Sequence, residues 1–275
     1  MIRLRNIIYL ILLIFIFPFL ILCAEVPITH RKSLQLLPQS QILALSLNQY
    51  SQIIKKSKLC EDPKKLAMVK RVGMRIARAT EEFLREEYPR QDRKFEWEFN
   101  LIEDDKVINA WALPGGKVAV YTGILPIARD DNGLAVVLGH EIGHVIANHG
   151  NERMSQALLT TMGGLTLSVA LSKKSKKTRD IFLAAYGIGA TVGFMLPYSR
   201  LQENEADRIG LILMAKAGYD PREALNFWLR MKKRGGKGKK IPEFLSTHPA
   251  TETRIQNIKR LIPEALPYYL KARKG

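Results

Sequence analysis

The sequence predicts an α+β fold that is mostly helical, with helices packed around a small mixed or antiparallel sheet. Residues 40–56 and 63–87 carry apolar side chains at helical spacing. Residues 95–101 instead alternate between polar and apolar side chains, which is typical of a half-buried strand. The chain has 275 residues and 47% hydrophobic content, enough for one domain. We expect that domain at residues 25–275, behind a leader at residues 1–24.

Two further short strands are expected after residues 95–101. Residues 107–112 and 117–121 lie on either side of Pro114-Gly115-Gly116, which is a turn signal. Strands this short can build only a small sheet, so helices must supply most of the core.

The leader is an apolar run from residue 7 to residue 24, preceded by two arginines. This pattern predicts an export signal or a short membrane anchor. Cys23 adds a third possibility, because the residues before it resemble a bacterial lipoprotein box, although Leu22 stands where a small residue is usual. All three possibilities place the domain on the periplasmic side of the cell envelope, free or membrane-associated. Cys23 and Cys60 are too few for a disulfide framework.

The pentad His140-Glu141-Ile142-Gly143-His144 has the spacing of a metal site on a helix. Helical residues turn by about 100° each, so His140 and His144 lie on one face and can share a metal ion. Glu141 stands beside that face. Its carboxylate can take a proton from water in the open position of a zinc ion and later deliver it to a leaving amine.

The neighbours of the pentad favour a metal site over a chance match. Residues 134–139 have no polar face, which is typical of a buried helix. Asp130 can cap the start of this helix, and Gly150 is expected to stop it. Two imidazoles and a carboxylate in a buried helix are costly unless they are paired or bind a metal.

A catalytic zinc ion needs a third protein ligand and keeps a fourth position for water. While the pentad helix continues, His149 is turned roughly 140° from His144 and Glu152 lies about 12 Å further along the axis, so neither reaches the metal. Glu203 and Asp207 are four residues apart and share one face of a later helix. Glu203 can serve as the ligand and Asp207 can orient a ligand histidine. An acidic cluster of this kind is also a common solvated helix face, and spacing alone leaves both interpretations open.

Two apolar stretches, residues 157–171 and 181–196, lie between the pentad and Glu203, joined by a basic segment at residues 173–179. Fifteen helical residues reach only about 22 Å, which is shorter than the hydrocarbon core of a membrane. We therefore expect buried helices that flank the site. The alternative is that the tip of this hairpin dips into a membrane surface, where its lysines meet anionic headgroups.

The chain is strongly basic, with 43 Lys and Arg against 26 Asp and Glu and a formal net charge of +17. A nucleic-acid partner is not expected, because the basic runs at residues 173–179 and 232–240 lack interleaved aromatic residues and follow an export leader. A solvated basic surface is the simpler interpretation, and attraction to anionic lipid or acidic clients is the alternative.

Four blocks in this order resemble the M48 metallopeptidases, the gluzincin group that includes the Ste24 and Oma1 proteases and similar bacterial envelope lipoproteins. The likeness covers about residues 26–262. The blocks are Asn109-Ala110-Trp111-Ala112-Leu113-Pro114-Gly115-Gly116, the pentad, Glu203-Asn204-Glu205-Ala206-Asp207, and Ser246-Thr247-His248-Pro249 followed by Arg254.

The resemblance implies a zincin-like domain that binds one zinc ion through His140, His144 and Glu203. It implies that Glu141 is the general base and that Asp207 orients a ligand histidine. These are expectations carried over from the family to matching positions of this chain.

The same resemblance implies two further roles. His248 and Arg254 are expected near the scissile carbonyl, where they can stabilise the developing oxyanion. Self-inhibition, in which His248 or the region after the pentad occupies the open zinc position until a substrate displaces it, is an open alternative that no residue pattern supports. Because zincin proteases bind extended substrate along an edge strand, we expect the substrate strand at Val118, Ala119, Val120 and Tyr121.

The predicted function is therefore a zinc-dependent endopeptidase of the bacterial cell envelope that cleaves unfolded, misfolded or misassembled proteins and approaches the membrane through its N-terminal segment. The alternative is a chaperone-like binding protein that contains zinc and cleaves little. A prenyl-protein protease similar to Ste24 would need several membrane-spanning helices, and only the leader is long enough. Oligomeric state and cleavage preference do not follow from the residues.

Overall fold

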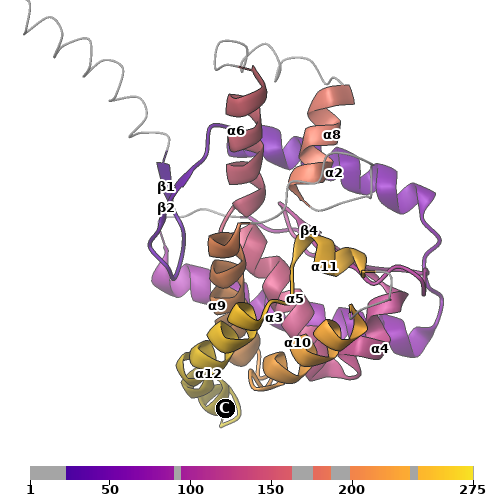
Figure 1. The fold of residues 1–275 in the computed structure, drawn as a ribbon, viewed down its shortest axis with the longest axis vertical. Coiled ribbons are helices and arrows are strands. Elements are labelled where there is room, and N and C mark those ends of the chain that lie inside the picture. Colours follow the sequence, from indigo (N-terminus) through magenta and orange to yellow (C-terminus); the bar gives the residue numbers. More distant parts are fainter. Residues whose placement is uncertain (1–22, 90–93, 163–175, 187–198, 236–240, 275) are drawn as a thin grey trace, which may run out of the picture.

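The fold is α+β and mostly helical, as predicted (Figure 1). The computed structural model describes residues 23–89, 94–162, 176–186, 199–235 and 241–274. Its strands are β1 (Cys23–Glu25), β2 (Lys32–Leu34), β3 (Glu98–Ile102), β4 (Ala110–Leu113) and β5 (Lys117–Tyr121). Its helices are α2 (Gln39–Lys56), α3 (Pro63–Glu87), the 3-10 turn η1 (Thr122–Ile124), α4 (Leu125–Ala128), α5 (Asp131–Ile146), α6 (His149–Met162), α8 (Lys176–Ala185), α9 (Arg200–Lys216), α10 (Glu223–Arg234), α11 (Glu243–Thr247) and α12 (Glu252–Ala272).

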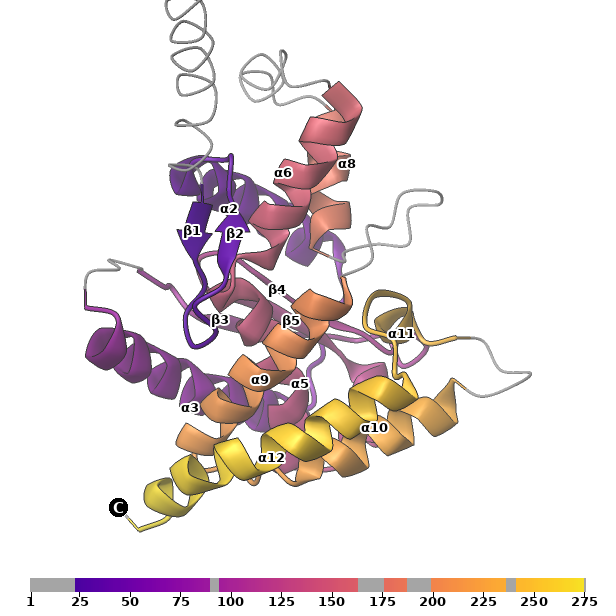
Figure 2. The same cartoon turned by 60° about the vertical axis from the view of Figure 1, so that its left-hand side comes forward.

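The pentad helix α5 is the centre of the molecule. It packs against β4 on one side and against α9 and α10 on the other, and α12 covers α9 (Figures 1 and 2). Every residue from Gly133 to Ile146 is buried, so the prediction of a buried helix is confirmed. The Asp130 carboxylate caps this helix by accepting a hydrogen bond from the Gly133 N–H at 3.0 Å.

The two long helices before the sheet are confirmed at the predicted positions, α2 at Gln39–Lys56 and α3 at Pro63–Glu87. α3 begins sharply because the Asp62 carboxylate accepts hydrogen bonds from the Lys64 and Lys65 N–H groups and Pro63 occupies the first turn. Its buried face packs against α5 and β3. It therefore supports the pentad helix and the sheet together.

The small sheet is mixed. Its strand order is β3-β5-β4, with β3 parallel and β4 antiparallel to β5. β5 matches the predicted range, whereas β3 and β4 begin three residues later than predicted. The chain reverses between β4 and β5 at Gly115 and Gly116, whose φ angles of 84° and 86° favour glycine. The turn predicted there is confirmed.

The prediction of an edge strand for substrate at Val118, Ala119, Val120 and Tyr121 is wrong. These residues belong to β5, which is the central strand and pairs with β3 on one side and β4 on the other. A strand paired on both sides has no free ladder for a substrate backbone. Sequence alternation predicts a strand, but it does not predict the position of that strand in the sheet.

The end of the pentad helix differs from the prediction. α5 ends at Ile146, not at Gly150, and α6 begins at His149. Asn148 lies between them with a φ of 55°, a left-handed conformation that asparagine tolerates better than most residues. The chain therefore changes direction just before His149, and Gly150 lies inside the next helix.

The apolar stretches after the pentad are described only in part, because residues 163–175 and 187–198 lie outside the described residues. α8 begins at Lys176, inside the segment predicted as a basic loop. Ile181 and Ala185 of α8 are buried with Met154 of α6 and Trp111 of β4 in a second hydrophobic cluster, which agrees with buried helices beside the site. Within the described ranges, no helix has the length and apolar character needed to cross a membrane.

Glycines allow α5 and α9 to pack with their backbones in contact. A Cβ atom added to Gly210 of α9 would lie 2.7 Å from the Gly139 carbonyl oxygen, and one added to Gly143 would lie 2.7 Å from the Ala206 carbonyl oxygen. This close approach brings the carboxylates of α9 within reach of the pentad.

We expect the Gly210→Ala substitution to lower the free energy of unfolding by about 1–2 kcal/mol, because overpacking of about 1–3 kcal/mol exceeds the gain of up to about 1 kcal/mol from replacing a helical glycine. Urea unfolding followed by circular dichroism measures the change. Lys259→Ala, at an exposed position of α12, serves as the control and should change stability by less than about 0.5 kcal/mol. A Gly210→Ala protein as stable as the wild type would contradict the tight contact.

Candidate metal centre

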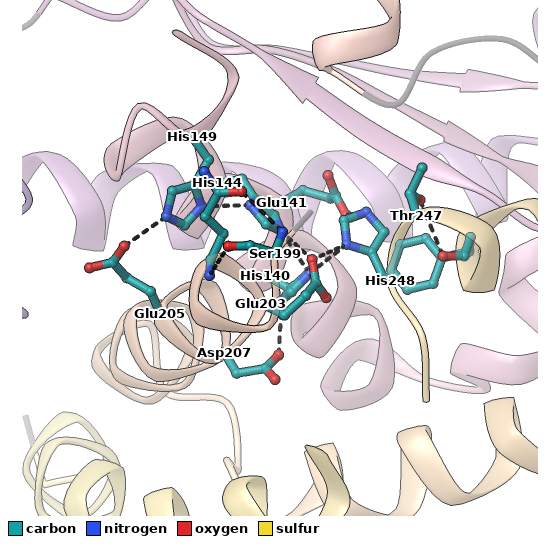
Figure 3. Close-up of polar contacts among 12 residues, drawn as sticks. His140, Glu141, His144, His149, Ser199, Glu203, Glu205, Asp207, Thr247 and His248 are labelled. Carbon is teal, nitrogen blue, oxygen red and sulfur yellow. Dashed lines mark hydrogen bonds and ion pairs between the residues drawn. The ribbon is translucent and has the colours of Figure 1, made fainter. Parts of the chain in front are cut away.

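The two pentad histidines point to the same spot. The Nε2 atoms of His140 and His144 lie 3.0 Å apart (Figure 3). Both side chains are buried, with 2% and 4% of their surface exposed. The predicted i, i+4 arrangement on one helical face is therefore present.

Glu203 comes to this spot from the first turn of α9. The start of α9 is held by a capping box, in which the Ser199 hydroxyl accepts from the Gln202 N–H and the Gln202 side chain accepts from the Ser199 N–H. Glu203 Oε1 then lies 3.3 Å from His144 Nε2, and Oε2 lies 3.6 Å from His140 Nε2. Glu203 is 4% exposed, so the interpretation as a solvated acidic face does not apply to it.

Asp207 lies one turn further along α9, at the position predicted for a partner of a ligand histidine. Its Oδ1 lies 2.9 Å from His140 Nδ1. A carboxylate accepts and does not donate, so His140 Nδ1 carries the proton and His140 Nε2 presents a lone pair. This contact fixes the orientation of the imidazole, with Nε2 directed at His144 and Glu203.

His248 joins the group from the end of α11. Its Nδ1 lies 2.8 Å from Glu203 Oε1 and 3.1 Å from His140 Nε2. Ligand atoms of His140, His144, Glu203 and His248 all lie within 4.8 Å of one another. Burial lowers the pKa of His248 to about 4, although Glu203 acts in the opposite direction. The predicted role of His248 at the scissile carbonyl stays a prediction.

Arg254 of α12 lies beside the centre and contacts the carboxylates of Asp207 and Glu203. Its Nε and Nη2 donate to Asp207 at 2.8 and 2.7 Å, and its Nη1 lies 2.5 Å from Glu203 Oε2. The guanidinium also stacks on Trp228, 3.6 Å from the ring centroid. Arg254 therefore holds the carboxylates in place, and the role predicted for it at the scissile carbonyl stays a prediction.

Glu141 is buried beside the two histidines, 3% exposed. Within the described part of the chain, its Oε1 has no hydrogen-bond partner. Burial raises the pKa of the Glu141 carboxyl well above its usual range, and the nearby Glu203 carboxylate raises it further. His248 Nε2 lies 3.5 Å from Glu141 Oε1. A carboxylate with a raised pKa and an oxygen without a hydrogen bond is suited to accept and return a proton.

The donor set fits a divalent metal ion. Two imidazole nitrogens and one carboxylate are the ligands that zinc uses in catalytic sites. Tetrahedral zinc places two ligand nitrogens about 3.4 Å apart, from zinc–nitrogen distances of about 2.0–2.1 Å. The observed separation of 3.0 Å is close to that value. The His140 lone pair faces His144 and the Glu203 carboxylate, so hydrogen-bond acceptors meet at one point. A bound cation would supply the positive charge that these acceptors need.

His149 lies beside the centre and is not among its ligand atoms, as predicted. The assumed reason, a continuous pentad helix, is wrong, because the chain turns at Asn148 and brings His149 next to His144. Its Nδ1 lies 2.7 Å from His144 Nδ1. An asparagine directly after an apolar helix was the available signal for this turn.

A buried HExxH helix, a glutamate from a following helix and a small mixed sheet together define a metallopeptidase of the zincin type. Residues 67–262 match Peptidase family M48. The chain belongs to this family, which confirms the resemblance drawn from the four sequence blocks.

Curated relatives agree with the family. The mitochondrial metalloendopeptidase OMA1 of Schizosaccharomyces pombe is 40% identical over 169 residues, 62% of this chain and 48% of that protein. The human metalloendopeptidase OMA1, mitochondrial, is 32% identical over 248 residues, 87% of this chain and 46% of that protein. A putative beta-barrel assembly-enhancing protease of Vibrio cholerae is 34% identical over 167 residues, 60% of this chain and 34% of that protein. The chain thus spans half or less of the length of these relatives.

These relatives correct the predicted localisation. The leader predicted a location on the periplasmic side of a bacterial cell envelope, either free or held by a signal anchor or by a lipid at Cys23. The OMA1 relatives from yeast and human are mitochondrial by name. The envelope localisation is therefore wrong as predicted, because an apolar leader alone does not identify the compartment.

Proposed function

We propose that this chain is a zinc-dependent endopeptidase. The observation that carries the proposal is the convergence of His140, His144 and Glu203 around one point, with Glu141 buried beside them and one oxygen left without a hydrogen bond by the described residues. His140, His144 and Glu203 would hold the ion. A bound zinc ion would polarise the scissile carbonyl and lower the pKa of a water molecule.

Glu141 acts as the general base and then as the general acid. Its carboxylate takes a proton from the attacking water and returns that proton to the leaving amine as the peptide bond breaks. Burial raises the pKa of this carboxyl above its usual range, and a raised pKa brings a carboxyl closer to the working pH at which one group can both accept and release a proton. Asp207 keeps His140 oriented throughout, and Arg254 balances the charges of Asp207 and Glu203.

Substrate backbone is expected along β4 instead of β5. Among the described residues β4 is an edge strand, paired with β5 on one side only, and it packs against α5. The Tyr121 N–H donates to the Asn109 carbonyl at 3.0 Å, so the alternate residues Ala110 and Ala112 direct their backbone groups away from β5. The Ala110 N–H is already bonded to the Asn109 side chain at 2.9 Å. The Ala112 backbone is therefore the best candidate to pair with an extended substrate.

An edge strand binds its partner through backbone hydrogen bonds, and only an extended segment offers these. We therefore propose unfolded or misassembled proteins as the substrate class. Such chains expose extended segments, whereas a folded domain keeps its backbone groups paired.

A second candidate function rests on His248. With His248, four buried protein side chains can face one ion, and structural zinc sites are closed by four protein ligands in this way. This arrangement favours a chaperone-like zinc protein that binds unfolded chains and cleaves little.

The purified full chain should contain about one zinc ion per molecule and should cleave β-casein, an unfolded protein. Chelation with 1,10-phenanthroline should abolish cleavage, and equimolar zinc should restore it. Atomic absorption and gel electrophoresis measure the two quantities. Zinc binding without cleavage of any unfolded protein would support the chaperone-like alternative, and absence of zinc would contradict the centre itself.

A further inference from the structure

A buried chain of hydrogen bonds leads away from the metal centre on the side of His144. His149 Nδ1 lies 2.7 Å from His144 Nδ1, and His149 Nε2 lies 2.8 Å from Glu205 Oε2. Figure 3 shows Glu205, His149 and His144 in this sequence, with His248 beyond His144. His149 has no exposed surface, and Glu205 is 5% exposed. Two imidazoles and a carboxylate are thus held in line, away from bulk water.

The Glu205 carboxylate at the end of this chain of hydrogen bonds determines which nitrogen of each imidazole carries a proton. The Glu205 carboxylate only accepts, so His149 Nε2 carries a proton and donates it. In a neutral imidazole the other nitrogen is then an acceptor, which makes His149 Nδ1 accept from His144 Nδ1. His144 consequently has its proton on Nδ1 and a lone pair on Nε2, the atom that faces His140 and Glu203.

Glu205 is itself held by the loop between β1 and β2. Arg31 donates from Nε to Glu205 Oε2 at 2.8 Å, and its two terminal nitrogens donate to Glu152 at 2.7 and 2.8 Å. The Thr29 hydroxyl donates to the other oxygen of Glu205. One guanidinium therefore joins a carboxylate of α9 to a carboxylate of α6, and the N-terminal hairpin supplies it.

We propose that His149 and Glu205 are positioning residues that hold His144 in the tautomer able to bind the metal, and that Arg31 anchors this pair from the N-terminal hairpin. This inference rests on the proposed function, because it assigns these residues to the same zinc site. Asp207 acts on His140 in the corresponding way, so each pentad histidine has its own partner outside the centre. Glu205, which had no predicted role, is the last member of the set of residues that orients His144.

Partners of this kind change metal affinity by about 10- to 100-fold when they are removed. Zinc dissociation constants are measured on the full chain by competition with a chromophoric chelator. We expect His149→Phe, which keeps a ring and removes both nitrogens, to bind zinc about 10- to 100-fold more weakly than the wild type. His149→Asn, whose amide oxygen can replace the Nδ1 acceptor, should restore affinity to within about threefold.

Glu205→Gln and Glu264→Gln form a matched pair. Glu205 bonds Arg31 and His149, whereas Glu264 bonds Arg208 at the exposed contact between α9 and α12. Glu205→Gln should weaken zinc binding at least about threefold, and Glu264→Gln should leave it unchanged. Equal affinities for the two variants would overturn the assignment of Glu205.

The ring protons of the zinc-loaded wild type give a test that needs no variant. Long-range ¹H–¹⁵N correlation should place the proton of His149 on Nε2 and that of His144 on Nδ1. A proton on His149 Nδ1, or wild-type zinc affinity in a folded His149→Phe protein, would overturn the proposal. If the wild type binds zinc but the expected results are not obtained, only the positioning role is wrong. If the wild type binds no zinc, the proposed function is wrong as well.

Discussion

Replacing Glu141 with glutamine is expected to abolish peptide-bond cleavage while leaving metal binding intact. The substitution keeps the shape of the side chain but removes its capacity to accept a proton, and loss of a general base costs about 10²- to 10⁴-fold in kcat. Glu141 does not belong to the group of ligand atoms around His140 and His144. Zinc content should therefore stay at the wild-type level, and steady-state cleavage of a fluorogenic peptide measures the loss.

The stability of the Glu141→Gln protein is informative as well. Glu141 is a buried carboxyl whose Oε1 has no hydrogen-bond partner among the described residues, and a neutral amide avoids the cost of burying a charge. We expect the variant to be at least as stable as the wild type in thermal unfolding. Glu252→Gln, an exposed carboxylate paired with Lys232, serves as the control and should cleave normally. Normal cleavage by Glu141→Gln itself would exclude Glu141 as the base and would favour a protein that works by binding.

Replacing Arg254 with methionine is expected to cause the largest loss of stability among single substitutions at this site. Arg254 is 3% exposed and lies between the carboxylates of Asp207 and Glu203. Removing one partner of a buried ion pair leaves uncompensated charge and costs about 3–5 kcal/mol. Loss of the contact with the Trp228 ring adds to this. Denaturant unfolding of the metal-free protein measures the change.

Arg208 provides the matched control. It also joins α9 to α12, through Glu264, but its side chain is 38% exposed and that of its partner is 39% exposed. Solvated pairs contribute about 0–1 kcal/mol, so Arg208→Met should destabilise the protein by less than about 1 kcal/mol. Equal losses in the free energy of unfolding for Arg254→Met and Arg208→Met would contradict the claim that burial makes the Arg254 ion pairs more important than a solvated pair.

Local patterns predicted the parts of this site that lie on single helices. The i, i+4 spacing of His140 and His144 and of Glu203 and Asp207 follows from helix geometry alone, and the structure places each pair as the spacing requires. The α2 and α3 ranges followed from apolar periodicity in the same way. The M48 family assignment, which residues 67–262 support, came from the order of four such local blocks.

Features that depend on where a segment sits among its neighbours were mispredicted. The pattern at Val118 to Tyr121 predicts a strand but carries no information on which strands pair with it, so an edge strand and a central strand look alike. His149 is not a ligand, as predicted, but its contact with His144 was not predicted, because a continuous helix was assumed where Asn148 is left-handed.

The sequence by itself determined the family, the helical segments and the identities of the predicted ligands and base, because each rests on spacing within one segment or on the order of segments. Only the tertiary structure decided that Arg254 lies between Asp207 and Glu203, that His248 lies among the ligand atoms, and that Arg31 reaches Glu205 across 174 positions of the chain. The physical reason is that each of these contacts joins segments far apart in the chain, and packing between elements decides how closely they approach. For α5 and α9 that packing is backbone contact at Gly139, Gly143 and Gly210, and no periodicity along one segment encodes it.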